Sequence, residues 1–122
     1  MIKPTDSELE ILNVLWKEGN ASVRKVNEIL SEEKETGYTT TLKLMQIMLE
    51  KGLVGRDTSQ RSHVYFPILK EKDVKGSMLK NFMQNAYEGS ASKLILQALG
   101  NHKMTTSELD EIKALIKKLE NK

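Results

Sequence analysis

The chain has 122 residues, of which 39% are hydrophobic and 30% are charged. This length makes one domain or two small ones, and the apolar side chains suffice to bury a core. The absence of cysteine excludes disulfides, thiol nucleophiles and cysteine-based metal sites. The sequence has no run of about 18 apolar residues that would predict a membrane span. Its polar beginning does not resemble a secretory signal, so we expect a cytoplasmic protein.

The net charge of +2 is unevenly distributed along the chain. Residues 1–35 hold five basic and eight acidic residues, whereas residues 36–70 hold five basic and two acidic ones. Residues 71–122 hold nine basic and seven acidic residues. The middle third is therefore the electropositive part of the chain, and a local basic surface is the first sign of nucleic-acid binding.

Two helices are predicted before residue 37. Thr5 and Glu8 have the spacing of a capping box, in which a hydroxyl and a carboxylate each accept a hydrogen bond from the backbone at a helix start. Apolar residues then recur at helical spacing up to Gly19, which favours the left-handed conformation that ends a helix. A second amphipathic helix is predicted to begin after Ser22, its N-cap, and to end before Gly37.

The third predicted helix runs from Tyr38 to Lys51, and Gly52 lies just beyond its end. One broad face is apolar and is expected to be buried. This face consists of Leu42, Met45 and Leu49, flanked by Leu44 and Met48. The opposite, exposed stripe consists of Thr39, Lys43, Gln46 and Glu50.

The hydrophobic period changes after this helix. Residues 53–57 and 63–66 have the character of short strands, and the polar residues 58–62 between them predict a turn. Two helices, a turn, a third helix and a β-hairpin are the elements of a winged helix-turn-helix. We therefore predict a mostly α-helical fold with a small β-hairpin, in which residues 1–70 form a winged-helix DNA-binding domain.

Three further helices are predicted after Pro67. The first ends at Gly89, and the second spans residues 90–99 and is stopped by Gly100. The third begins at Thr105, which opens a second capping box. Each of these helices has one apolar side that needs a partner surface.

Residues 71–122 are predicted to form a helical dimerisation domain. So short a region cannot make a robust core of its own. The apolar spacing in the last helix is that of a coiled-coil seam and favours a second copy of the chain as the partner. Packing against residues 1–70 is the alternative. The residues expected at this interface are Met78, Phe82, Leu94, Ile95, Leu99, Leu109, Ile112, Leu115, Ile116 and Leu119.

The third helix and the hairpin carry the residues that we expect to contact double-stranded DNA. Thr39 and Thr40 add hydroxyl donors at a helix N-terminus, which suits a phosphate. Further along the same helix, Lys43 and Gln46 have the groups that pair with the edges of guanine and adenine. The hairpin residues expected to bind phosphates or a narrow minor groove are Arg56, Arg61 and Ser62.

Two other functions compete with DNA binding. An enzyme is disfavoured because His63 and His102 have no neighbouring partners for a metal site or a general base, and no glycine-rich phosphate loop is present. We therefore expect no catalytic residue, no metal and no cofactor. A winged helix that contacts only proteins remains an alternative, because a fold does not settle its function.

Three motifs in this order and spacing resemble the penicillinase-repressor family, BlaI/MecI. They begin at Thr5-Asp6-Ser7-Glu8, Gly37-Tyr38-Thr39-Thr40-Thr41 and Arg61-Ser62-His63-Val64-Tyr65. The similarity continues through residues 82–99 and the last helix, so it covers essentially the whole chain. The resemblance implies a homodimeric winged-helix repressor that occupies an operator and blocks transcription. In such a dimer, two third helices related by a two-fold axis would read a palindrome. The resemblance carries the DNA-contact role onto Tyr38, Thr39, Thr40, Leu42, Lys43 and Arg61.

The chain also departs from this family in features that concern regulation. In the antibiotic-resistance members, a membrane sensor triggers cleavage between Asn and Phe in the helix before the last. The resemblance thus implies a sensor-linked protease as a partner, although Gln97-Ala98 stands at the matching position here. The copper-responsive members use a C-terminal cysteine motif, which this chain lacks. Leu42 replaces a polar residue of some members, so the operator sequence need not be the usual one.

Overall fold

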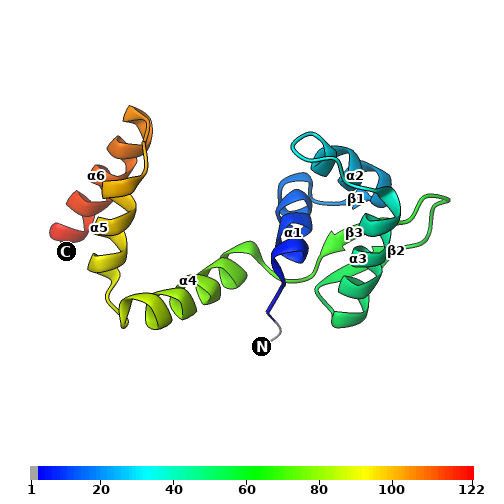
Figure 1. Cartoon of the computed structure of the whole chain (residues 1–122), viewed down its shortest axis with the longest axis horizontal. Coiled ribbons are helices and arrows are strands. Elements are labelled where there is room, and N and C mark those ends of the chain that lie inside the picture. Colours follow the sequence, from blue (N-terminus) through cyan, green and yellow to red (C-terminus); the bar gives the residue numbers. More distant parts are fainter. Residues whose placement is uncertain (1–2) are drawn as a thin grey trace. The chain divides into compact units, whose positions relative to one another are not determined.

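The structure is a computed structural model that describes residues 3–122 (Figure 1). It divides into two compact units, of which the first ends at Met78 and the second is Leu79–Lys122. The expected boundary between residues 70 and 71 lies just before α4, and the division between the units falls inside that helix. The elements are α1 (Asp6–Glu18), β1 (Ala21–Ser22), α2 (Val23–Ser31), α3 (Tyr38–Lys51), β2 (Val54–Asp57), β3 (Val64–Pro67), α4 (Glu71–Tyr87), α5 (Ala91–Asn101) and α6 (Thr106–Glu120).

The first two helices begin at the capping residues that the sequence predicts. Thr5 Oγ1 accepts a hydrogen bond from Glu8 N at 3.2 Å, and Glu8 Oε1 accepts one from Thr5 N at 2.9 Å. Ser22 Oγ accepts a hydrogen bond from Lys25 N at 3.1 Å and so caps α2. Gly19 ends α1 with a φ of 86°, a conformation that glycine adopts without strain.

The bounds of α3 are those that the sequence predicts. Gly52 follows the helix in the left-handed conformation, with a φ of 80°. The predicted polar stripe is exposed along its whole length, at Thr39, Lys43, Gln46 and Glu50. The buried side chains of the helix are Thr41, Met45 and Met48, whereas Leu42, Leu44 and Leu49 are half-buried.

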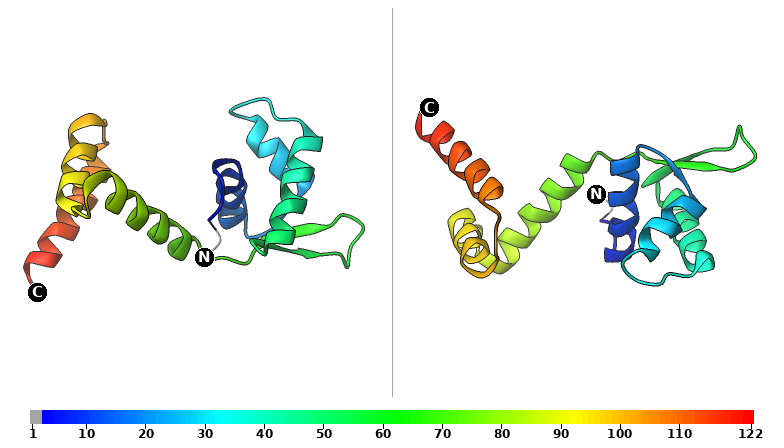
Figure 2. Two further views of the ribbon diagram at one scale, coloured as in Figure 1. Left: turned by 60° about the horizontal axis from the view of Figure 1, so that its bottom comes forward. Right: turned by 90° about the horizontal axis from the view of Figure 1, so that it is seen from above.

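The predicted hairpin is confirmed, and one further strand joins it. The three strands form an antiparallel sheet in the order β1-β3-β2. In β1, Ala21 pairs with Tyr65 and Ser22 pairs with Val64. A strand of two residues is too short to show the alternation of apolar and polar residues that predicts a strand, so the sequence does not predict β1. The pairing brings the start of α2 next to β3, while the turn between β2 and β3 projects beyond the helices (Figures 1 and 2).

The core of the first unit lies between its helices and the sheet. Trp16 Nε1 donates a hydrogen bond to Leu69 O at 2.9 Å, and Lys75 Nζ lies 5.5 Å from the centroid of the Trp16 ring. These contacts fix the segment between β3 and α4 against α1. The buried apolar residues of the core are Ile11, Leu12, Val14, Leu15, Ala21, Val23, Val26, Met45, Met48, Leu53, Val54 and Tyr65.

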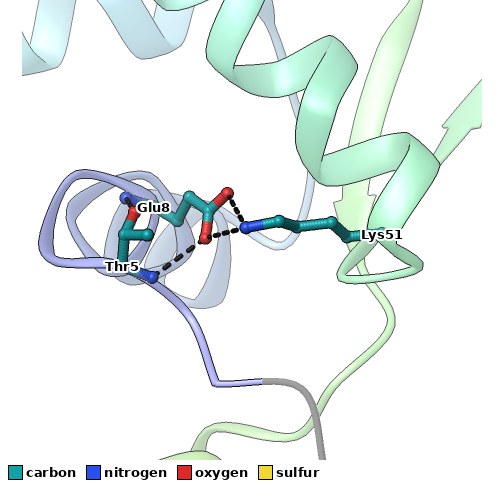
Figure 3. A network of polar contacts seen from close by, with 3 residues as sticks. All are labelled: Thr5, Glu8 and Lys51. Carbon is teal, nitrogen blue, oxygen red and sulfur yellow. Dashed lines mark hydrogen bonds and ion pairs between the residues drawn. The ribbon is translucent and has the colours of Figure 1, made fainter.

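One ion pair is built into the edge of this core (Figure 3). Glu8 is only 2% exposed, and Lys51 Nζ donates hydrogen bonds to its two carboxylate oxygens at 2.8 and 3.0 Å. Burial alone would raise the pKa of Glu8, but the hydrogen bonds from Lys51 and Thr5 and the charge of Lys51 outweigh it. The pKa of Glu8 therefore lies below its usual value of 4.5. The pair joins the first turn of α1 to the last turn of α3.

The helix ends of the second unit agree with the sequence except at one glycine. α4 ends at Tyr87, close to Gly89, which has a φ of 81°. The capping box at Thr105 opens α6 as predicted. The prediction that Gly100 stops α5 is wrong, because the helix continues to Asn101. A glycine inside a helix costs only about 1 kcal/mol relative to alanine, so it does not by itself end one.

None of the side chains in Leu79–Lys122 is buried. Of the residues expected at a dimer interface, Met78, Leu94, Leu99 and Ile112 are half-buried, and Phe82, Ile95, Leu109, Leu115, Ile116 and Leu119 are exposed. Leu79 and Leu96 are also exposed, and Leu96 is 69% accessible to solvent. The second unit therefore has no buried core of its own, and its large apolar side chains are in contact with solvent.

Candidate nucleic-acid interface

The start of α2, the exposed face of α3 and the wing together line one groove in the first unit. The wing is the hairpin of β2, β3 and the turn between them, residues 54–67. Of the residues expected to bind DNA, Tyr38, Leu42, Gln46, Arg56, Arg61 and Ser62 line this groove. The other lining residues are Ser22, Val23, Arg24, His63 and Tyr65.

The groove gathers every arginine of the chain. The sequence has three arginines among its 19 basic residues, and these are Arg24, Arg56 and Arg61. None of the lining residues is acidic. Within residues 3–122, the ion pairs join lysines to glutamates, so no arginine is neutralised by a carboxylate. Arginine presents a planar fork of donors that matches phosphate oxygens and the guanine edge, so this grouping suits a nucleic acid.

Arg56 lies over an aromatic ring of the neighbouring strand. It pairs across the sheet with Tyr65, and its guanidinium carbon lies 6.0 Å from the centroid of that ring. Tyr65 is 2% exposed, whereas Arg56 is exposed, so this is a cation–π contact at the surface that contributes about 0.5 to 1 kcal/mol. The contact favours a position of the Arg56 side chain in which it lines the groove.

Three of the expected DNA contacts lie on α3 outside the groove. Thr39, Thr40 and Lys43 are exposed, but they are not among the lining residues. Gly37 occupies the N-cap position of α3, and no side chain caps this helix start. The first backbone N–H groups of α3 thus have no side-chain partner, which leaves them available to a phosphate.

Thr41 has a structural role, unlike the two threonines before it. It is fully buried, and its hydroxyl donates a hydrogen bond to Asn27 Oδ1 at 2.8 Å. Asn27 lies on α2, so this bond joins the two helices of the helix-turn-helix. The contact adds a buried polar link to the apolar packing of α3 against α2.

A local hydrogen bond shapes the turn of the wing. Asp57 Oδ1 accepts a hydrogen bond from Ser59 N at 2.9 Å, the arrangement of an Asx-turn. Hydrogen bonds from the side chain and the backbone of Ser59 lower the pKa of Asp57 below its usual value of 3.8. Asp57 is not among the residues that line the groove.

Sequence reasoning missed five of the groove residues, and one structural fact explains most of them. Ser22, Val23 and Arg24 lie at or just after β1, and only the pairing of β1 with β3 brings them to the wing. His63 and Tyr65 were predicted as strand residues without a binding role. The sequence contains one signal for Arg24. The chain has only three arginines, and the other two are already expected to bind DNA.

Two other kinds of site are absent from residues 3–122. Among these residues, no group of three or more histidine, aspartate or glutamate side chains converges so as to hold a metal ion. No helix in this part of the chain is long and apolar enough to cross a membrane. The groove brings together six of the nine residues that the sequence predicts to bind DNA.

The comparisons with known proteins point to one family. The family model described as penicillinase repressor matches residues 4–118. The methicillin resistance regulatory protein MecI of Staphylococcus aureus (strain N315) is 24% identical over 114 residues, which cover 93% of this chain and 93% of that protein. The penicillinase repressor of Bacillus licheniformis is 24% identical over 118 residues, which cover 97% of this chain and 92% of that protein.

A solved structure agrees with the fold of the first unit. The solution structure of the DNA-binding domain of the repressor BlaI matches with a TM-score of 0.51 and 26% identity. The match covers 59% of this chain and 93% of the BlaI domain. It confirms the predicted winged-helix fold of this unit.

Proposed function

This chain belongs to the penicillinase repressor family, a family of transcriptional repressors and not of enzymes, and we propose that it is a cytoplasmic, homodimeric repressor that binds a palindromic operator. In this proposal α3 enters the major groove of DNA and the wing contacts the flanking backbone. The repressor activity follows from membership of this family. The contacts, the dimer and the symmetry of the operator are inferred from the surfaces of this chain.

The observation that carries the proposal is the composition of the groove. All three arginines of the chain and no acidic residue line it, next to the exposed polar stripe of α3. Such a surface attracts phosphates beside the helix that would read the bases.

The residues of this surface have distinct proposed roles. Lys43 and Gln46 read base edges, because both are exposed on α3. Thr39 and Thr40 bind a phosphate at the helix start. The remaining proposed contacts are Tyr38 and Leu42, which offer apolar surface to thymine methyl groups, and Arg56, Arg61 and Ser62, which bind the backbone or the minor groove from the wing.

We propose that the second unit forms the dimer interface. Its helices leave Phe82, Leu96 and Leu115 more than half exposed, and none of its side chains is buried. Exposed apolar surface of this extent marks an interface, and a second copy of the chain offers the matching face by two-fold symmetry. Two copies of α3 related by such an axis read a palindrome whose half-sites lie about one DNA turn apart, or a multiple of it.

Binding to DNA tests the proposal directly. Fluorescence anisotropy of the purified protein is measured with the duplex upstream of its own gene and with a scrambled duplex, each at low and at physiological salt. The proposal predicts tighter binding to the native duplex that persists at physiological salt. Failure to bind either duplex at low salt would contradict it and would favour the alternative of a module that contacts only proteins.

A sensor-linked protease is the partner that the family resemblance implies for release of the operator. The candidate dipeptide Gln97-Ala98 lies inside α5, and Gln97 is exposed. A cut there would separate α6 from α4 and divide the proposed dimer surface. Immunoblots of cells under inducing conditions test this step. Loss of the full-length chain together with derepression supports it, whereas derepression with an intact chain contradicts it.

A further inference from the structure

Arg24 is a groove residue to which neither the sequence motifs nor the roles proposed above give a function. It lies in the first turn of α2, and its side chain is exposed. It lines the same groove as Arg56 and Arg61, which come from the wing. One cation from the helix-turn-helix and two from the hairpin therefore face one hollow.

The sheet explains why Arg24 lies beside the wing. Ser22 pairs with Val64 of β3 and also caps α2, so the start of this helix is tied to the wing strand. Val23 is 7% exposed and anchors the same turn in the core. The position of Arg24 is thus fixed by a strand pair on one side and by buried packing on the other.

The neighbouring cation on the same helix has different surroundings. Lys25 lines a separate hollow between α1 and α2, and this hollow also contains Lys17, Glu18 and Glu32. Arg24 faces a groove that no acidic residue lines. The hollow of Lys25 thus holds two carboxylates beside its two lysines, whereas the groove of Arg24 holds three arginines and no carboxylate. An anionic ligand would therefore neutralise the charge of Arg24 and is not needed to balance that of Lys25.

We infer that Arg24 binds a DNA backbone phosphate, as a contact from α2 that accompanies those of α3 and the wing. The inference rests on the proposed function and adds a residue to its interface. The first helix of a helix-turn-helix crosses the DNA backbone while the second lies in the major groove, so a cation at the start of α2 meets phosphate and not a base edge. Arg24 and Arg61 then hold the DNA backbone from two elements.

Salt titrations of point variants test this contact. The binding constants of wild type, Arg24→Ala, Arg24→Lys and Lys25→Ala are measured by anisotropy over a series of salt concentrations. The probes are the duplex upstream of the protein's own gene and a random-sequence duplex of equal length. Unfolding followed by the fluorescence of Trp16, the only tryptophan, verifies that each variant is folded.

Arg24→Ala is expected to bind both duplexes about tenfold more weakly at low salt, since a charge-assisted hydrogen bond is lost. The slope of log K against log salt should become shallower by about 1. Arg24→Lys should keep the wild-type slope with weaker binding, because the charge remains and the fork of donors is lost. Lys25→Ala, the matched control, should behave as wild type.

The outcomes separate this inference from the function on which it rests. Binding by wild type with an unchanged slope in Arg24→Ala would overturn the inference alone. An equal effect of Lys25→Ala would also overturn it, because it would show a general charge effect. A loss confined to the native duplex would overturn the phosphate assignment in favour of a base contact. Absence of binding by wild type to either duplex would overturn both proposals.

Discussion

At the scale of single residues, two polar contacts hold the helices of the first unit against one another. Glu8 on α1 is paired with Lys51 on α3, and the Thr41 hydroxyl donates to Asn27 on α2. Glu8 and Thr41 are both buried, so each depends on its partner to offset the cost of leaving water. These contacts therefore affect the stability of the unit.

The ion pair predicts how stability depends on pH. Because the pKa of Glu8 is lowered in the folded state, its contribution to stability is fully present above its unfolded value of 4.5. The contribution is lost as the pH falls below that value and through the folded pKa. We predict that Glu8→Gln, which retains the capping geometry, flattens the fall of the unfolding free energy below pH 4.5.

Urea unfolding followed by Trp16 fluorescence at several pH values measures this effect. Glu10→Gln is the control, because Glu10 is an exposed carboxylate of the same helix, and it should leave the pH dependence as in wild type. An acid dependence in Glu8→Gln that equals that of wild type would show that the pair does not act as described.

The buried hydroxyl gives a second prediction at this scale. Thr41→Val keeps the side-chain volume but removes the donor to Asn27 Oδ1, so it should lower the free energy of unfolding by about 1 to 2 kcal/mol. Thr40→Val introduces the same change at an exposed position and should alter stability by less than about 0.5 kcal/mol. Equal stabilities of the two variants in urea unfolding would contradict the structural role of Thr41.

At the scale of elements, α3 and the wing divide the work of binding. α3 exposes Lys43 and Gln46 from a single helix, whereas the wing contributes Arg56 and Arg61 to the groove. Contacts from a helix in the major groove carry sequence information, while contacts to the backbone position the protein on any duplex. Variants of the two elements should therefore fail in different ways.

Substitutions of one residue in each element test this division. Lys43→Ala should lower affinity for the native duplex and reduce the preference for it over a scrambled duplex by about 1 to 3 kcal/mol. Arg61→Ala should weaken binding to both duplexes to a similar extent. Lys17→Ala, which removes an exposed charge of α1 away from the groove, is the control and should change neither. A Lys43→Ala protein with wild-type preference would contradict the assignment of α3 as the reading element.

The helices and strands of this chain differ in how far the local sequence predicts them. The bounds of α3 were predictable because Gly52 and the change of hydrophobic period mark its end within the local sequence. β1 was not, because its two residues are a strand only through pairing with β3, far along the chain. Arg24 was missed for the same reason, since its place in the groove depends on that pairing. The error at Gly100 arose because a glycine weakens a helix without ending it.

At the scale of the whole molecule, the two units differ in how they bury apolar surface. The first has a closed core around Leu12, Met45 and Tyr65. The second, Leu79–Lys122, has no buried side chain, although it carries many large apolar ones. A chain with this composition lowers its free energy by association, so we infer that the second unit is completed by its copy.

Disruption of the last helix tests the proposed dimer. Ile112→Asp with Ile116→Asp places two charges on the apolar side of α6 and should yield monomers in sedimentation, with weak operator binding. Lys113→Asp with Lys117→Asp repeats the same spacing and substituent on the exposed polar side and should remain dimeric. Circular dichroism verifies that the helices persist. A double isoleucine variant that still sediments as a dimer would place the interface elsewhere.

Nuclease footprinting on the DNA upstream of the protein's own gene tests the central claim most directly, because it reports binding, specificity and symmetry together. A dimer that reads DNA through two copies of α3 should protect a segment containing an inverted repeat, with half-site centres about 10 base pairs apart or a multiple of that. Arg24→Ala, Lys43→Ala and Arg61→Ala should each weaken that protection. Uniform cleavage at all protein concentrations, or protection of a segment without two-fold symmetry, would contradict a homodimeric repressor that binds a palindrome.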